Sequence, residues 1–309
     1  MQTRIAAILL IAFSLIGATT VESAWAHEFT SDESSAFLAL VESIKVELDL
    51  VNSSLLTNVT SATEHAAHAH EHLDEHTVEE IAERNERLGT DLPAALGRLH
   101  MSVRNGTSDQ VADNIQEIRD LLDETVSVRI ESNQKTNSTT MAVVVATLVD
   151  GSLEHYKLAY GIGTENGGHD DDHDSGNTTS MDGHGMEMDG ISTGMNGSTV
   201  IVNMVSYETA QGLAERARAV FNEDARILAP ANATEALAAA SAGLYELSQS
   251  ISARAPPTDI ELIVHGNIHP NLQQAFNLQV IPEFPAPLIA GMAAFAGIVA
   301  AARLRHLRA

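Results

Sequence analysis

Apolar residues recur every three or four positions along most of the chain. Within residues 31–56, Ile44, Leu48 and Val51 follow this spacing, which predicts an amphipathic helix with one buried face. The segment Met141 to Val149 is apolar all round, so we expect its helix at the centre of the core. The same spacing predicts further helices over residues 60–88, 92–103, 107–126, 139–160, 200–222, 233–253 and from 256 onward.

Local signals indicate where these helices begin and end. Thr107 or Ser108 is suited to cap the helix that follows. Gly89 is suited to end the helix over residues 60–88. The pair His269-Pro270 is expected to interrupt the last helix, because the residue before a proline disfavours the helical conformation. A strand over residues 143–145 is an alternative, but no partner strand is visible. We therefore predict an all-α fold.

One stretch, residues 167–197, has no apolar periodicity and is rich in glycine, serine, aspartate and histidine. Such a segment cannot bury enough apolar surface to fold alone, so we predict a flexible linker over residues 167–198. The linker joins two helical, bundle-like halves, a first domain over 27–166 and a second over 199–280. Residues 1–26 and 281–309 have the composition of targeting segments.

The linker also carries side chains that bind transition metals. Thioethers favour Cu(I), whereas imidazoles also suit Cu(II), Ni and Zn, so the segment is a candidate metal reservoir. The alternative is an acidic, solvated spacer in which these side chains are incidental. The candidate ligands are His169, His173, Met181, His184, Met186 and Met188.

A second histidine-rich segment runs from Glu64 to His76 on the predicted helix over 60–88. At about 100° per residue, four histidines fall within an arc of about 80°, while His70 points away. Imidazoles three or four residues apart can share an ion, which predicts a Zn, Cu or Ni site completed by carboxylate or water. A solvated polar face and a cluster that titrates near pH ~6 are the alternatives. The candidate ligands are His65, His68, His72 and His76.

The remaining histidines give weaker signals, and we assign no metal to them. His155 lies on the apolar helix over 139–160, where a buried histidine with satisfied hydrogen bonds is expected. His265 and His269 have helical spacing, but Gly266 and Pro270 are expected to break the helix there.

The N-terminus has the three parts of a secretory signal peptide. Arg4 is followed by an apolar run from Ile5 to Ala18 and by the sequence Ala24-Trp25-Ala26, which is typical of a cleavage site. We expect removal of residues 1–26, which leaves His27 as the new N-terminus of an exported protein.

The C-terminus reads Pro282-Glu283-Phe284, then an apolar run over 288–302, then a basic cluster over 303–308. Basic residues after such a run stay in the cytoplasm. This tail resembles the PEFG-CTERM sorting signal of archaeal surface proteins, with Pro285 where the family usually has glycine. The resemblance covers residues 282–309 and implies an archaeosortase-like processing enzyme as a partner and attachment to the envelope. A plain C-terminal membrane anchor is the alternative.

Charge and composition narrow the possible functions. The formal net charge is −25 at pH 7, which argues against nucleic acid as a partner and favours cations. The chain has no cysteine, which excludes disulfides, thiolate metal sites and blue-copper centres. No H-E-x-x-H, G-x-S-x-G or phosphate-binding glycine-rich motif occurs, so an enzyme is the weaker interpretation.

Sequons of the form Asn-x-Ser/Thr are more frequent than the composition predicts by chance, which favours glycosylation of an exported chain. The sequon asparagines are Asn52, Asn58, Asn105, Asn137, Asn177, Asn196 and Asn232.

These patterns together predict an envelope-anchored, extracytoplasmic protein at the cell surface that binds copper, or alternatively zinc or nickel, for capture, buffering or transfer. Two other functions stay open. One is a structural or interaction glycoprotein of the surface, and the other is a metalloenzyme or accessory subunit that uses the histidines over 65–76.

Overall fold

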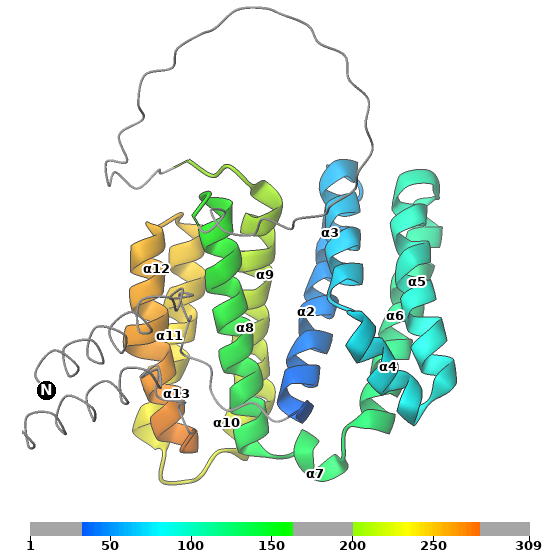
Figure 1. The fold of residues 1–309 in the computed structure, drawn as a ribbon. Helices are drawn as coiled ribbons and strands as arrows, with labels where there is room; N and C mark the ends of the chain where they lie inside the picture. Colours follow the sequence, from blue (N-terminus) through cyan, green and yellow to red (C-terminus); the bar gives the residue numbers. More distant parts are fainter. Residues whose placement is uncertain (1–32, 163–199, 279–309) are drawn as a thin grey trace, which may run out of the picture. The chain divides into compact units, whose positions relative to one another are not determined.

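The computed structural model describes residues 33–162 and 200–278, and every regular element in these two ranges is a helix (Figure 1). The all-α prediction is confirmed for this part of the chain. The predicted signal peptide, linker and sorting tail lie outside the described residues. The elements are α2 (Glu33–Ser54), α3 (Val59–Glu71), α4 (Glu75–Arg84), α5 (Glu86–Asn105), α6 (Ser108–Arg129), α7 (Ser132–Lys135), α8 (Ser138–Ala159), α9 (Met204–Val220), η2 (Phe221–Ala225), α10 (Arg226–Leu228), α11 (Thr234–Ser252), α12 (Pro257–Ile263), η3 (Val264–Ile268) and α13 (His269–Phe276).

Helix α8 lies at the centre of the described helices, as its apolar composition predicts. It packs along α9 and also contacts α2, α12 and α13 (Figure 1). Val144, Val145 and Val149 on α8 are fully buried. Ser152 Oγ on α8 donates a hydrogen bond of 2.7 Å to the carbonyl oxygen of Ala210 on α9, which joins the two helices at this point.

Helices from both sides of the predicted linker therefore pack together, and the described residues 33–162 and 200–278 belong to one compact unit. The helices α2, α3, α5 and α6 share a core of leucine, isoleucine and valine side chains with small alanines on α3. The buried alanines Ala62, Ala66 and Ala69 allow α3 to approach its neighbours closely. Whether residues 199–280 fold as a domain of their own stays a prediction.

The single helix predicted over 60–88 is wrong. The structure divides it into α3, α4 and the start of α5, because two polar side chains cap new helices inside the range. Asp74 accepts a hydrogen bond of 2.7 Å from the Thr77 backbone N–H and begins α4, and Asn85 accepts one of 3.1 Å from that of Arg87 and begins α5. Such side-chain caps satisfy backbone donors that a helix start leaves free.

Gly89 does not end a helix, as the sequence suggested, but lies inside α5. A Cβ atom at this position would lie 2.6 Å from the Cβ of Ala82 on α4. The glycine is therefore required for the close approach of α4 and α5 rather than for a helix stop.

Two other predicted boundaries have different outcomes. Thr107 caps α6 in a capping box with Gln110, in which each side chain bonds the other residue's backbone N–H, so that prediction is confirmed. The expected break at His269-Pro270 is wrong, because the π-helical turn η3 carries the chain directly into α13. Pro270 lies in the first turn of α13, where a missing backbone N–H is tolerated.

We predict that the described helices fold without the linker. Deleting residues 168–197 should leave the helical circular dichroism per residue unchanged or higher, because every helix contact described above lies outside that range. Cooperative thermal unfolding should also remain. A broad, non-cooperative transition in the deletion variant would show that the linker contributes to folding.

Candidate metal centre

A buried carboxylate lies at the centre of the helical unit. Glu47 belongs to α2 and is 1% exposed, because it follows Ile44 by three residues and precedes Val51 by four on the apolar face. Burying an ionised carboxylate is costly unless it has partners. Thr209 Oγ1 on α9 donates to Glu47 Oε1 over 2.9 Å, and the second carboxylate oxygen bonds a histidine on α3.

That histidine, His65, is fully buried and lies between two carboxylates. Its Nδ1 is 2.7 Å from Glu47 Oε2, and its Nε2 is 3.0 Å from Glu208 Oε2 on α9. Burial lowers the pKa of His65, but the hydrogen bonds and charges of Glu47 and Glu208 outweigh this and raise the pKa above its ordinary value. Both ring nitrogens then donate, since carboxylates only accept. In the metal-free protein a proton thus takes the place that a cation can occupy.

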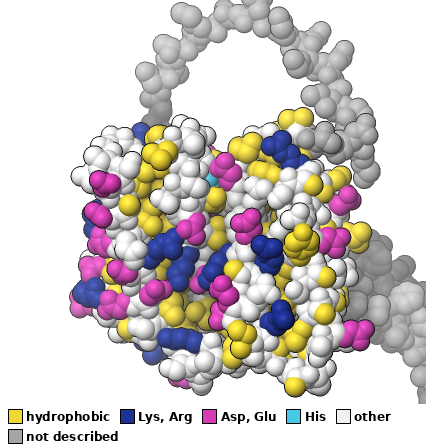
Figure 2. Space-filling model, turned by 180° about the vertical axis from the view of Figure 1, so that it is seen from behind, with side chains coloured by type: hydrophobic (Ala, Val, Ile, Leu, Met, Phe, Trp, Pro, Cys, Tyr) yellow, Lys and Arg dark blue, Asp and Glu magenta, His cyan; other side chains and the backbone are white. Residues whose placement is uncertain are grey.

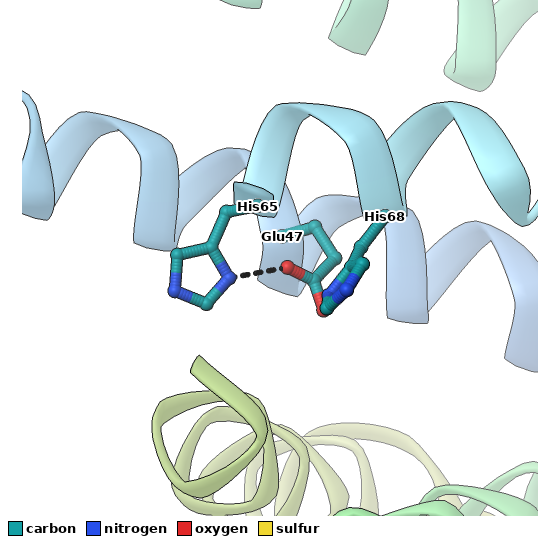
Figure 3. Close-up of side chains that lie close together, drawn as sticks. All are labelled: Glu47, His65 and His68. Atoms are coloured by element: carbon teal, nitrogen blue, oxygen red, sulfur yellow. Dashed lines mark hydrogen bonds and ion pairs between the residues drawn. The ribbon is translucent and has the colours of Figure 1, made fainter. Parts of the chain in front are cut away.

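His68 lies one turn further along α3 and faces the same carboxylate. Its Nδ1 is 3.9 Å from Glu47 Oε1, and its ring is edge-on to that of His65, with 6.3 Å between the ring centres. Figure 3 shows both imidazoles directed to the Glu47 carboxylate, with α2 and α3 supplying the three residues. His68 Nδ1 is buried and makes no hydrogen bond in the described residues.

The donor atoms of Glu47, His65 and His68 all lie within 4.8 Å of one another. Donors bound to one ion at about 2.0–2.2 Å lie at most about 4.4 Å apart, so small side-chain rotations close the group around an ion. A set of imidazole and carboxylate donors without sulfur suits Zn²⁺, Cu²⁺, Ni²⁺ and related divalent ions. This group is able to hold a metal ion.

Helix α8 brings a further imidazole to this cluster. The rings of His155 and His68 are tilted by 45°, with 6.3 Å between their centres. Burial, together with the charges of His68, His72 and His65, lowers the pKa of His155 to about 4, and Glu47 opposes this shift. A buried histidine with satisfied hydrogen bonds was expected here. The residue is instead half-buried, and its buried Nδ1 makes no hydrogen bond in the described residues.

Tyrosines fix the helices that carry His155 and Glu208. Tyr156, the neighbour of His155, is fully buried and donates to the carbonyl oxygen of Ala255 over 2.6 Å. Tyr207, the neighbour of Glu208, donates to the carbonyl oxygen of Ile251 over 2.9 Å. These bonds hold α8 and α9 to the end of α11, which limits how far the cluster can move.

The other two histidines of the predicted one-face cluster, His72 and His76, are not part of the group formed by Glu47, His65 and His68. His76 is on α4 rather than α3, and its side chain is 77% exposed with Nδ1 3.5 Å from Glu80 Oε1. The one-face arrangement is therefore wrong for His76, because the Asp74 cap divides the predicted helix. His72 follows the end of α3 and is half-buried. Burial and the charge of His68 lower the pKa of His72, while Glu47 and Glu71 oppose this shift. The role of His72 as a ligand stays a prediction. His70 is exposed, as predicted.

Sequence reasoning missed Glu47, Glu208 and His155, which lie on three other helices. The flanking acids it favoured, such as Glu64 and Glu71, are exposed. An acidic residue on the apolar face of α2 was the available signal for Glu47. The linker candidates His169, His173, Met181, His184, Met186 and Met188 lie outside the described residues.

A second histidine pair lies on η3 and α13. His269 is 6% exposed, and its Nε2 is 3.0 Å from Asp150 Oδ1 on α8. The rings of His265 and His269 are 5.3 Å apart between centres. The helical spacing of this pair is retained because η3 continues into α13, contrary to the expected break.

The described surface carries few histidines and several sequon asparagines. On the face drawn in Figure 2, charged side chains of both signs are interspersed and almost no histidine surface is visible. Asn58 and Asn137 cap α3 and α8 through Oδ1, which leaves Nδ2 available for a sugar. Glycosylation stays a prediction. The described sequon asparagines are all exposed: Asn52, Asn58, Asn105, Asn137 and Asn232.

No protein-family model, curated protein or solved structure matches this chain. Among the helices of residues 33–162 and 200–278, none combines the length and apolar character needed to cross a membrane.

The metal-free protein should lose stability in mild acid because of His155. The unfolded chain binds the His155 proton as pH falls through 6.5, whereas the folded protein binds it only at about 4, so the free energy of unfolding falls between these values. The total loss in the free energy of unfolding over this pH range is on the order of 3 kcal/mol. His65 has a raised pKa and is protonated in both states over this range, so it adds no slope there.

Chemical denaturation between pH 7 and pH 4, in the presence of a chelator, measures this effect. The His155→Phe variant should show a shallower fall in the free energy of unfolding than wild type, since the other titrating groups are common to both. If the free energy of unfolding falls equally steeply with pH in wild type and in His155→Phe, the acid sensitivity does not come from His155.

Proposed function

We propose that this protein is an envelope-anchored, extracytoplasmic metal-binding protein that captures, buffers or transfers copper. The observation that carries the proposal is the group formed by Glu47, His65 and His68, whose donor atoms lie within 4.8 Å of one another inside the helical unit. The predicted signal peptide and sorting tail support the location. The excess of acidic residues supports an encounter with cations.

Copper is favoured over other divalent ions by general coordination chemistry. For nitrogen and oxygen donors, Cu²⁺ has the highest affinity in the first-row series, and imidazole with carboxylate is a donor set it accepts. The methionines of the predicted linker support the same element in its reduced state, because thioether sulfur selects Cu(I). Zinc and nickel are the ions that compete with copper for the group formed by Glu47, His65 and His68.

The proposed metal also accounts for the placement of Glu208. A metal-bound histidine commonly donates its second ring N–H to a carboxylate, which fixes the orientation of the ring. His65 Nε2 lies 3.0 Å from Glu208 Oε2, and Ser61 Oγ donates to the same oxygen over 2.7 Å. An ion would replace the proton at His65 Nδ1 and leave this outer chain of contacts in place.

Metal titration of single variants tests the proposal. The His65→Ala and His68→Ala variants should bind Cu²⁺ or Zn²⁺ at least about 10-fold more weakly than wild type, a loss of about 1.4 kcal/mol or more. His70→Ala is the matched control, since this residue is on α3 but exposed. Equal losses in all three variants would indicate non-specific chelation by a histidine-rich surface and would refute the buried site.

The linker should bind both Cu(I) and Cu(II), and its methionines should matter only for Cu(I). In a peptide of residues 167–197, changing Met181, Met186 and Met188 to leucine should weaken Cu(I) binding and leave Cu(II) binding unchanged, because sulfur selects the reduced ion. Binding should be moderate and exchangeable, since it must offset the entropy of ordering the segment. Indifference of Cu(I) to the three substitutions would return the linker to the role of an acidic spacer.

A surface glycoprotein function is the second candidate. It is favoured by the exposure of every described sequon asparagine. The two functions are compatible, because glycosylation at these positions leaves the buried cluster unchanged.

A further inference from the structure

Two buried imidazole nitrogens beside Glu47 make no hydrogen bond in the described residues, His68 Nδ1 on α3 and His155 Nδ1 on α8. Buried polar atoms in folded proteins almost always have a partner, so exceptions require an explanation. The two residues are far apart in the sequence, and α3 and α8 bring their rings to 6.3 Å between centres. A shared ligand explains both atoms at once.

The two rings are near enough to share one ion after a small movement. With metal–nitrogen bonds of about 2.0 Å and tetrahedral angles, two rings bound to one ion have centres about 5 Å apart. The centres of His68 and His155 are 6.3 Å apart, as are those of His65 and His68, so each pair must close by about 1 Å when the ion binds.

We propose that His155 on α8 is the fourth protein ligand of the ion, together with Glu47, His65 and His68. This inference rests on the proposed function, because it extends the same site. The complete ligand set is three imidazoles and one carboxylate. It joins α2, α3 and α8 directly, and α9 through Glu208.

His72 is the competing source of a fourth ligand, and the structure favours His155 over it. His155 has a defined ring contact with His68 and a buried ring nitrogen without a hydrogen bond. His72 is the C-cap of α3, where its backbone N–H bonds the His68 carbonyl oxygen over 3.1 Å, and it has neither a described ring contact nor a buried ring nitrogen without a hydrogen bond. A ligand on the central helix α8 is fixed by its packing, which lowers the cost of ordering it when the ion binds.

Site-specific nitrogen NMR of the histidine rings tests the assignment without altering the protein. The full chain, labelled with ¹⁵N and freed of metal, is titrated with Zn²⁺, which is diamagnetic. Ring nitrogens of His65, His68 and His155 should move together to the shifts of metal-bound nitrogen at the first tight equivalent. The His155→Phe variant identifies the His155 signals by their loss.

The outcomes separate the two proposals. Movement of His65 and His68 while His155 stays unchanged, or movement of His72 in its place, overturns the fourth-ligand assignment and retains the site. No movement of any of these rings overturns the proposed function itself. In addition, His155→Phe should weaken Zn²⁺ binding about 10-fold or more, whereas His70→Phe should not. An unchanged affinity in a His155→Phe variant that keeps cooperative unfolding also overturns the assignment.

Discussion

The Glu47→Ala variant is expected to be the least stable single variant of the metal-free protein. Removing one partner of a buried ion pair costs about 3–5 kcal/mol where the other charge is left buried without compensation. His65 keeps Glu208 at its Nε2, so we expect a loss near the lower end of this range. Here Glu47 accepts from His65 and from Thr209, and both donors lose their partner in the variant. The melting temperature should fall by about 6–12 °C for a protein of this size.

Thermal and chemical unfolding in the presence of a chelator measure the loss. Glu79→Ala is the matched control, because Glu79 is an exposed acid on α4 and surface substitutions of this kind usually change stability by less than about 0.5 kcal/mol. Similar losses in the two variants would mean that the contacts of Glu47 contribute little to the folded state.

Saturating Cu²⁺ or Zn²⁺ is expected to raise the free energy of unfolding by about 4 kcal/mol at a free ion concentration of about 1,000 times Kd. The reason is that the group formed by Glu47, His65 and His68 exists only in the folded state, where α2 and α3 bring its members together. Metal held by the linker adds nothing to this shift if the linker binds equally in the folded and unfolded chain. The thermal shift therefore reports the buried site and not the linker.

Two variants of α3 test whether the metal-dependent rise in stability comes from the buried site. His68→Ala should lose most of the metal-dependent rise in melting temperature, and the exposed His70→Ala should keep it. A rise that persists in His68→Ala would place the stabilising ion elsewhere in the protein.

The helical periodicity of the sequence predicted much of the fold, because amphipathic spacing depends on local sequence alone. The errors are at boundaries that a single polar side chain decides. Asp74 and Asn85 start new helices by accepting backbone hydrogen bonds, and both lie within a pattern that otherwise continues. Gly89 was mistaken for a stop because the close approach of Ala82 is a tertiary feature.

The candidate site was only half predictable for a related reason. His65 and His68 are adjacent on one helix, so their spacing in sequence was enough to bring them together. Glu47, Glu208 and His155 meet them only through the packing of α2, α9 and α8, and nothing local pairs residues so far apart. The same limit misplaced His76, whose position depends on the turn at Asp74.

The most direct test of the central claim is the metal content of the protein after reconstitution with Cu²⁺ and dialysis against a weak chelator, which removes exchangeable metal from the linker. Elemental analysis should find one ion per wild-type chain and close to none in a variant that combines His65→Ala with His68→Ala. Wild-type chains that retain no metal, or a double variant that retains as much as wild type, would contradict a metal site at Glu47, His65 and His68.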